Sequence, residues 1–462
     1  MLKRDINRKL IEWKNRDHHP LILSGLRQTG KTFSVKEFGK ENYKSVVYID
    51  FRNEKKLHQV FDGDFDVNMM VMGISALRND VRFIEHETLL IFDEIQDCPN
   101  ARSSLKYWDI DGRYDVIATG SFLSVKGFRK PYVRGVPVGY EEHMHMYPLT
   151  FREFAMNMGL ADNVWNYVSD CIERTKHVDE AVHSGMRRLY LQYLIVGGMP
   201  EAVNAFLKNT DINQIRQIQR SVIDSLKADF GRYLDSNNKE KINETVKLRA
   251  EACLNSLPGQ LSKEYKKFQY SMVNLKANSP EKLDGVTYLE DVGLLIRAYN
   301  VCELSAPLEG VKKSNEYKAY FCDNGLLMAM LESETAWNVL NGDLSAYKGA
   351  IAENMVAATF NSLDKPVYYY REASGSPELD FVFNDQGNIS IIECKSVNDK
   401  CTSMRYVLSK PKKYGEHKGI KIADSNIGEC DAFVTYPLYA LSFLLDKERP
   451  LALERVTFDM QQ

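Results

Sequence analysis

The sequence predicts an α/β protein with three parts: a parallel sheet with flanking helices, a mainly helical middle, and a second α/β unit at the C-terminal end. Strand and helix patterns alternate through the first part, as in a parallel sheet wrapped by helices. Helical periodicity dominates the middle, and short apolar strand patterns return in the last part. At 462 residues the chain is too long for one ordinary core. We therefore expect three domains, at residues 1–155, 156–340 and 341–462.

The composition excludes several classes of protein. Hydrophobic residues make up 44% of the chain and charged residues 27%, and the formal net charge is −3, which argues against a globally basic nucleic-acid binder. The eight cysteines are scattered without a C-x-x-C pair, so we expect no zinc site, no disulfide framework and a reducing compartment. The sequence contains no signal-peptide core and no apolar run of about eighteen residues, which predicts a cytoplasmic protein without a membrane span.

A buried apolar strand, a glycine-framed loop and a helix start follow one another in residues 20–32. The loop fits the P-loop pattern G-x-x-x-x-G-K-[ST] at every fixed position. Gly25 and Gly30 let the backbone turn sharply, so that its N–H groups point inward around a phosphate. Lys31 is expected to reach the β- and γ-phosphates, and the Thr32 hydroxyl to bind Mg²⁺. The residues predicted to contact the nucleotide are Gly25, Leu26, Arg27, Gln28, Thr29, Gly30, Lys31, Thr32 and Phe33.

Two adjacent carboxylates follow an apolar strand pattern at residues 88–92. These residues, Asp93 and Glu94, stand where the carboxyl end of a parallel strand opens on a ligand crevice. We expect Asp93 to hold the Mg²⁺ shell and Glu94 to orient and deprotonate the attacking water. A solvent-capped strand end is the alternative for such a pattern in isolation, and the upstream P-loop favours the catalytic interpretation.

A fourth strand pattern, at residues 114–118, ends in hydroxyl-bearing residues. Thr119 and Ser121 suit a group that senses the γ-phosphate or its attacking water, and a plain strand-to-turn exit is the alternative. No N-K-x-D guanine-reading motif occurs in this part of the chain, so we expect ATP as the nucleotide.

The middle part has helical patterning and two features that stand out. Residues 197–200, Gly-Gly-Met-Pro, are typical of a helix stop followed by a proline-started helix. Residues 240–300 suggest a compact helical module that ends in a glycine turn and an apolar strand, as in a winged helix. Such modules bind DNA in some proteins and other proteins elsewhere, so both interpretations stay open. The lysines near a candidate recognition helix are Lys263, Lys266 and Lys267.

Strand patterns in the last part carry acidic residues and a lysine at alternate positions. Alternate residues on a strand face the same side, so Glu393 and Lys395 point together, and Glu378 and Asp380 do likewise. Two carboxylates from adjacent strands and one lysine suit a hard cation and phosphodiester hydrolysis. The order matches the PD-(D/E)xK nuclease pattern, with Asp380 and Glu393 as metal ligands and Lys395 as the catalytic lysine. Ion-paired strands with the same letters are common in ordinary sheets, so a structural interpretation stays open.

Two further features accompany this pattern. Glu353 matches the helix carboxylate that often goes with it, and Glu353 and Glu378 are candidates of second rank. Basic residues outnumber acidic ones between residues 395 and 421, which suits a phosphate backbone or, with equal weight, a solvated charged face. These basic residues are Lys395, Lys400, Arg405, Lys410, Lys412, Lys413, Lys418 and Lys421.

Together these motifs resemble the AAA-type P-loop ATPases of bacteria and archaea that carry a C-terminal PD-(D/E)xK nuclease-like domain of unknown function. The resemblance covers nearly the whole chain and rests on residues 25–32, 93–96, 119–121 and 147–154. It implies a P-loop ATPase domain, a helical and winged-helix middle, and a C-terminal α/β restriction-nuclease-like domain.

The chain departs from this family at one position. Many relatives have Gly-Arg shortly before the segment that corresponds to residues 147–154, whereas this chain has Gly139 and Tyr140. Arg134 and Arg129 are the candidate substitutes for that arginine finger. If hydrolysis needs a charge from a neighbouring subunit, the protein forms a homo-oligomer.

The sequence therefore leads to two hypotheses. The first is a Mg²⁺-dependent ATP-binding and ATP-hydrolysing protein, coupled to DNA or RNA through its nuclease-like C-terminal domain. The alternative is a nucleotide-switched protein-interaction scaffold with an inactive nuclease-like tail. The two differ in whether Glu378, Asp380, Glu393 and Lys395 converge on one point with room for a metal.

Overall fold

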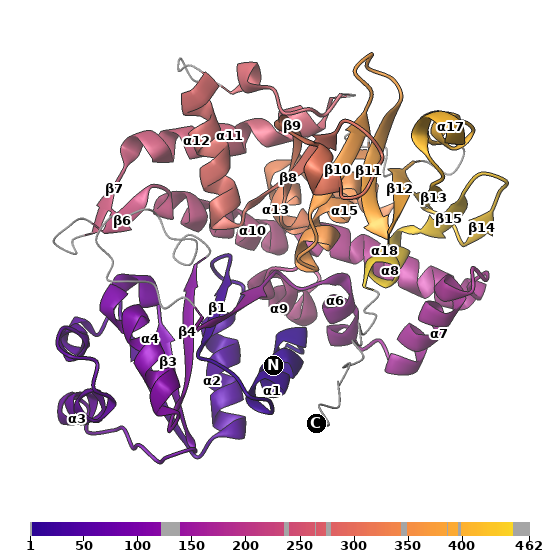
Figure 1. The fold of residues 1–462 in the computed structure, drawn as a ribbon. Helices are drawn as coiled ribbons and strands as arrows, with labels where there is room; N and C mark the ends of the chain where they lie inside the picture. Colours follow the sequence, from indigo (N-terminus) through magenta and orange to yellow (C-terminus); the bar gives the residue numbers. More distant parts are fainter. Residues whose placement is uncertain are drawn as a thin grey trace, which may run out of the picture.

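The computed structural model describes residues 2–121, 139–234, 240–263, 265–273, 279–342, 349–385, 387–395 and 399–446. The N-terminal unit lies on one side of the molecule and a larger unit, built from the middle and C-terminal segments, lies on the other (Figure 1). None of the described helices combines the length and the apolar character that a bilayer span needs.

The N-terminal unit is organised around a sheet of five strands in the order β2-β3-β4-β1-β5, and every neighbouring pair is parallel. The expected parallel sheet is therefore confirmed. Its strands are β1 (Leu21–Gly25), β2 (Ser45–Asp50), β3 (Thr88–Asp93), β4 (Asp115–Ser121) and β5 (Glu142–Met146). Its helices are α1 (Asp5–Lys14), α2 (Lys31–Asn42), η1 (Lys55–Phe61), α3 (Val67–Leu77), η2 (Ile95–Asp97) and α4 (Pro99–Asp111).

Helices cover both faces of this sheet, which explains why its central strands are continuous apolar runs. Trp13 of α1 and Phe38 of α2 pack on one face against Leu23 and Ile91. Aromatic side chains fill the other face, where Phe51, Phe61 and Phe92 contact one another edge to face. Because the sheet is buried on both faces, a ligand is expected at the ends of its strands, and in open parallel sheets that is the carboxyl end.

Helices dominate the segment that follows, as the sequence predicts. They are α6 (Phe151–Asn157), α7 (Asp162–Glu173), α8 (Glu180–Val196), α9 (Pro200–Lys208), α10 (Ile212–Asp229), α11 (Glu244–Leu261), η3 (Tyr270–Met272) and α12 (Ser279–Val292). A two-stranded ribbon of β6 (Arg232–Leu234) and β7 (Glu240–Ile242) joins α10 to α11.

The larger unit contains a mixed sheet of eight strands in the order β14-β15-β13-β12-β11-β10-β8-β9. Its strands are β8 (Leu295–Val301), β9 (Lys312–Phe321), β10 (Val367–Arg371), β11 (Glu378–Asp385), β12 (Asn388–Cys394), β13 (Lys418–Ala423), β14 (Gly428–Glu429) and β15 (Val434–Pro437). The helices of this segment are η4 (Leu308–Val311), α13 (Asn324–Met330), α14 (Ser333–Leu340), α15 (Ala350–Ser362), α16 (Thr402–Leu408), α17 (Pro411–Tyr414), η6 (Leu438–Ala440) and α18 (Leu441–Leu445).

This sheet joins segments on both sides of the expected boundary at residue 341, because β8 and β9 precede that residue. The expected helix, glycine turn and strand are present as α12, Gly293 with a φ of 83° and β8. However, β8 pairs with β9 and β10 of the large sheet. The winged-helix identity and the three-domain division therefore stay predictions.

The Gly-Gly turn after α8 is one of the places where the two units touch. The turn separates α8 from the proline-started α9, as its sequence predicts. A Cβ on Gly198 would lie 2.2 Å from the Leu149 carbonyl oxygen, so only glycine fits. Asp323 accepts hydrogen bonds from the backbone N–H of Gly198 (2.6 Å) and of Leu326 (3.0 Å), the second of which caps α13. A single buried carboxylate thus ties this turn to α13.

Asp323 predicts a pH-dependent contribution to stability. Burial raises the pKa of Asp323 to about 6, although backbone N–H groups partly offset this rise. An acid with a raised pKa in the folded state destabilises the fold as the pH rises from about 4 through 6. We expect Asp323→Asn to lower the free energy of unfolding by about 1–3 kcal/mol, because an amide group would face a backbone N–H donor.

Since asparagine does not titrate, this loss should be larger at pH 5 than at pH 7.5 by on the order of 1 kcal/mol. Urea unfolding at both pH values measures it, with the exposed Asp17→Asn as the control. An equal loss at both pH values would contradict the assignment.

Candidate nucleotide-binding site

The P-loop connects β1 to α2 and adopts a backbone that its glycines make accessible. A Cβ on Gly25 would lie 2.2 Å from the carbonyl oxygen of Met146, and Gly30 has a φ of 95° at the N-cap of α2. The Lys31 ammonium donates to the carbonyl oxygens of Gly25 (3.1 Å) and Leu26 (2.9 Å) within the loop. Burial lowers the pKa of Lys31 to about 8, an effect that Glu94 and Asp93 partly oppose.

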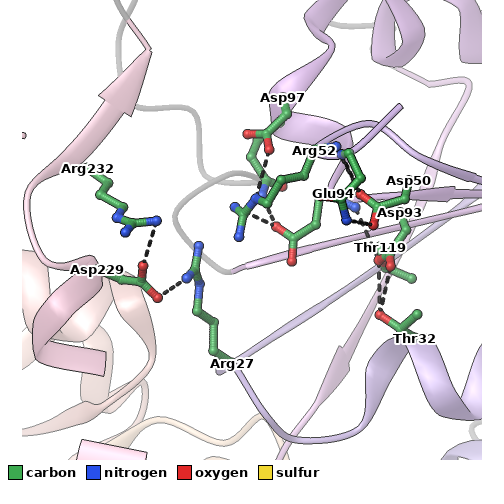
Figure 2. A network of polar contacts seen from close by, with 12 residues as sticks. Arg27, Thr32, Asp50, Arg52, Asp93, Glu94, Asp97, Thr119, Asp229 and Arg232 are labelled. Atoms are coloured by element: carbon green, nitrogen blue, oxygen red, sulfur yellow. Dashed lines mark hydrogen bonds and ion pairs between the residues drawn. The ribbon is translucent and has the colours of Figure 1, made fainter. Parts of the chain in front are cut away.

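Asp93 at the end of β3 accepts hydrogen bonds from three hydroxyl groups, and Figure 2 shows two of the donors, Thr32 and Thr119, beside it. The Thr32 hydroxyl lies 3.0 and 3.1 Å from its two oxygens, and the Tyr48 hydroxyl donates at 2.8 Å. Thr119 also donates to this carboxylate. The structure therefore brings together the two residues predicted to bind Mg²⁺, Thr32 and Asp93. Thr119, predicted as a γ-phosphate sensor, lies against the same carboxylate, and the side chain of Ser121 lies outside the described residues.

Glu94, the predicted general base, is held by neighbouring side chains. It has a left-handed backbone with a φ of 52°. Its carboxylate accepts hydrogen bonds from Arg52 (3.2 Å) and from the amide of Gln96. The same Arg52 donates to Asp97 at 3.1 Å. Glu94 is thus anchored beside Asp93 by an arginine from the loop after β2.

Arg4, just before α1, holds the P-loop through a hydrogen bond to its backbone. Its guanidinium donates to the carbonyl oxygens of Thr29 (3.0 Å) and Tyr147 (2.7 Å) and pairs with Glu153 at 3.0 Å. Glu153 also completes a capping box with Thr150 at the start of α6. The segment 147–154, on which the family resemblance partly rests, therefore acts as an anchor for the P-loop.

The remaining loop residues have different surroundings. Leu26 and Thr29 are buried, and the Thr29 hydroxyl donates to the Leu26 carbonyl oxygen at 2.8 Å. The side chains of Arg27 and Gln28 contact Asp229 and Ser225 at the end of α10. Phe33 is 54% exposed on the first turn of α2.

Sequence reasoning missed several residues at this site. Tyr48 and Arg52 belong to β2 and the loop after it, and the signal was available there, since that strand also ends in an acidic residue, Asp50. Asp229 and Arg232 lie about two hundred residues from the P-loop, and no motif marks them. Arg129 and Arg134, the predicted finger substitutes, lie outside the described residues.

The C-terminal motif residues come together only in part. The Lys395 ammonium lies 2.9 Å from Asp380, whose carboxylate also accepts the backbone N–H of Cys394 at 3.1 Å. Glu393 is 1% exposed, and neither of its carboxylate oxygens accepts a hydrogen bond of ordinary geometry. Burial, with a smaller contribution from Asp380, raises the pKa of Glu393 to about 7. Asp380, Glu393 and Lys395 therefore form one cluster, in which the two carboxylates are buried and the lysine is partly exposed.

Lysines neutralise the other two acidic candidates. Lys318 of β9, which is 2% exposed, lies 2.9 Å from Glu378. Lys266 pairs with Glu353, which also accepts a hydrogen bond from Tyr320 at 3.0 Å. No group of three or more metal-ligating side chains is found in the part of the chain that the structure describes. Glu353 and Glu378 are therefore engaged elsewhere, which leaves Asp380 and Glu393 as a two-carboxylate donor set.

Several lysines of the 395–421 stretch are also engaged within the fold. Lys413 pairs with Glu372 at 2.6 Å, and the nearly buried Lys421 donates to the Asp399 carbonyl oxygen at 2.7 Å. The Lys410 ammonium lies 3.9 Å from the Tyr406 ring centroid. These contacts favour the view that the basic residues of this stretch form a solvated charged face, and they count against a surface that holds a nucleic acid.

Comparison with known proteins identifies the class of the N-terminal unit. Residues 17–155 match the family described as AAA domain. With the P-loop and the Thr32–Asp93 contact on one sheet edge, this match makes the unit an AAA-type P-loop ATPase domain that binds nucleotide. Residues 187–336 and 348–439 match two families described as Domain of unknown function, DUF8612 and DUF4143.

Solved structures similar to the chain include nucleotide-binding proteins of archaea. One is the Walker-type ATPase PABY2304 of Pyrococcus abyssi, with 15% identity, 71% of this chain and 96% of that chain covered, and a TM-score of 0.40. Another is the Aeropyrum pernix ORC2 protein in ADPNP-ADP complexes, with 13% identity, 73% and 91% covered, and a TM-score of 0.34. No curated protein matches the chain significantly.

The Arg4 anchor gives a prediction for stability. Its side chain is 7% exposed, so Arg4→Ala would leave Glu153 as a buried charge without its counter-ion. We expect a loss of about 3–5 kcal/mol in the free energy of unfolding. Arg4→Lys should recover little of it, because an ammonium lacks the planar fork that serves three acceptors.

Chemical denaturation measures both variants. The matched control is Arg8→Ala, since Arg8 is 57% exposed and pairs with the equally exposed Glu12. That control should change stability by less than about 1 kcal/mol. Equal losses for Arg4→Ala and Arg8→Ala would refute the anchoring role.

Proposed function

We propose that this protein is a Mg²⁺-dependent ATP hydrolase whose P-loop site is formed by Gly25–Thr32, Asp93 and Glu94. The contact between the Thr32 hydroxyl and the Asp93 carboxylate, at the carboxyl end of a strand in an all-parallel sheet, is the observation that carries this proposal. A hydroxyl and a carboxylate are the oxygen donors that Mg²⁺ takes beside nucleotide phosphates. When bound, Mg²⁺ would neutralise charge that develops on the phosphates.

The residues of this chain would bind the phosphates and activate the attacking water. The P-loop N–H groups and Lys31 would hold the phosphates, and Lys31 would regain its full charge next to them. Glu94, next to Asp93, would accept a proton from the attacking water, with Arg52 and Gln96 fixing its carboxylate. Phe33, exposed on the first turn of α2, is proposed as a contact for the nucleotide.

For this activity, we expect Lys31→Ala to weaken ATP binding by more than about tenfold, because the phosphates lose their fixed cation. Glu94→Gln should keep ATP binding and lower kcat by about 10²- to 10⁴-fold, since an amide cannot accept the proton. Titration with a fluorescent ATP analogue and phosphate release measure the two effects. Glu94→Gln with wild-type turnover would remove Glu94 from the mechanism.

A second candidate function is metal-dependent phosphodiester cleavage of DNA or RNA at Asp380, Glu393 and Lys395. The specific observation in its favour is the buried Glu393 carboxylate, which has no hydrogen-bond donor of ordinary geometry and lies in one cluster with Asp380. A divalent cation would supply the missing partner and offset the repulsion between the two carboxylates. The neutralised Glu353 and Glu378 favour instead an inactive scaffold that responds to the nucleotide.

Cleavage assays with Mg²⁺ or Mn²⁺ separate these roles of the C-terminal unit. If the unit is a nuclease, Lys395→Ala should abolish cleavage by about 10²-fold or more, because charge on the phosphate is no longer stabilised. ATP turnover should stay unchanged, since the P-loop lies in the other unit. Lys412→Ala, on an exposed position of α17, is the control. Wild-type protein that cuts neither DNA nor RNA, with or without ATP, leaves the scaffold role.

Assembly is part of the same proposal. The family's Gly-Arg is absent at Gly139-Tyr140, so a neighbouring subunit of a homo-oligomer would have to supply an arginine finger if none acts within the chain. Specific activity that rises with protein concentration would support supply from a second subunit.

A further inference from the structure

An ion-pair chain connects the P-loop to the end of α10. Arg27, inside the P-loop, pairs with Asp229, the last residue of α10. Asp229 also pairs at 3.1 Å with Arg232, the first residue of β6. Figure 2 shows these three side chains on one side of the site, with Glu94, Arg52 and Asp97 opposite. These ion pairs therefore hold the guanidinium groups of Arg27 and Arg232 beside the loop on which the phosphates would lie.

In the absence of a nucleotide, the arginines around the loop pair with carboxylates. Arg52 pairs with Glu94 and Asp97, whereas Arg27 and Arg232 share Asp229. Burial lowers the pKa of Arg27, with Arg52 and Arg232 adding to this effect and Glu94 opposing it, so these charges act on one another. A triphosphate adds several negative charges to this group, and guanidinium pairs with phosphate oxygens as well as with a carboxylate.

We propose that Arg27 and Arg232 bind the terminal phosphates of ATP from within the same chain, and that Asp229 is the counter-ion they leave when ATP binds. This inference rests on the proposed ATPase function and names the cation source for it. Arg27 is covalently part of the phosphate-binding loop, so its guanidinium stays within side-chain reach of the phosphates. All three side chains are partly exposed, at 25%, 17% and 38%, so their partners can exchange without burying an isolated charge.

The helix that carries Asp229 is also connected to other parts of the molecule. In α10, Arg216 donates to the carbonyl oxygens of Met328 (2.8 Å) and Leu331 (2.7 Å) at the end of α13. At the other end of α13, Asn324 accepts a hydrogen bond from Asn354 of α15 at 3.0 Å. The helix that ends at Asp229 is therefore hydrogen-bonded to α13, and α13 to α15.

Nucleotide affinities and turnover of the full chain test the proposal. We expect Arg27→Gln and Arg232→Gln to weaken ATP binding by about tenfold and ADP binding by less than about threefold, because ADP lacks the terminal phosphate. Asp229→Asn should tighten ATP binding by about threefold or more, since ATP no longer competes with a carboxylate. A tighter complex is a result that a damaged fold cannot produce. Arg174→Gln is the control, because Arg174 is 61% exposed at the C-cap of α7.

The outcomes distinguish this inference from the proposed function. Wild-type protein that neither binds nor hydrolyses ATP refutes the proposed function itself. Wild-type activity together with equal losses of ATP and ADP binding in Arg232→Gln, or with weaker ATP binding in Asp229→Asn, overturns only the inference. Turnover per molecule that stays constant on dilution supports an arginine within the chain, and turnover that falls on dilution opposes it.

Discussion

The buried guanidinium of Arg4 is the interaction on which the nucleotide site depends. It serves the Thr29 carbonyl, the Tyr147 carbonyl and Glu153 at once, so the P-loop, the end of β5 and the start of α6 share one cation. Gly25 also approaches the Met146 carbonyl too closely for any side chain, so only glycine lets the start of the loop pack against β5. A loop that must present N–H groups to phosphate is thus rigid before the ligand arrives, which lowers the ordering cost of binding.

A few residues near the nucleotide site contact both units. Tyr147, whose carbonyl oxygen accepts from Arg4, donates its hydroxyl to Asp364 beyond α15. Gly198 meets Leu149 on one side and Asp323 on the other. Glycine is required there because two backbones meet, whereas the P-loop glycines allow a sharp turn around a ligand. The segment that anchors the P-loop therefore also contacts the larger unit, through Tyr147 and Leu149.

The sequence alone predicts that Thr32 and Asp93 lie together, as the structure shows, because the signals for them are local. Lys31, Thr32, Asp93 and Glu94 each follow an apolar strand, and strand ends of a parallel sheet must meet at one edge. The ion-pair chain of Asp229 and Arg232 escapes prediction, since helical periodicity fixes a face but not which distant loop that face meets. The same limit applies in the large mixed sheet. Alternation along β11 places Glu378 on the same face as Asp380. However, Lys318 of β9, a strand that precedes residue 341, forms an ion pair with Glu378.

The two charged clusters of this protein differ in how easily their partners can exchange, and this difference separates their functions. Around the P-loop the arginines are partly exposed, so a phosphate can replace a carboxylate at little desolvation cost. In the C-terminal sheet Lys318 is almost fully buried, and burial disfavours its charge unless Glu353, Glu378 and Asp380 stay ionised around it. Displacing such a lysine would strand a charge in the interior, at a cost of several kcal/mol. Of the four acidic candidates, Glu393 alone has no lysine bonded to it among the described residues, and both of its carboxylate oxygens are buried without a hydrogen-bond partner there, so a cation that bound at Glu393 would displace none of the buried lysines.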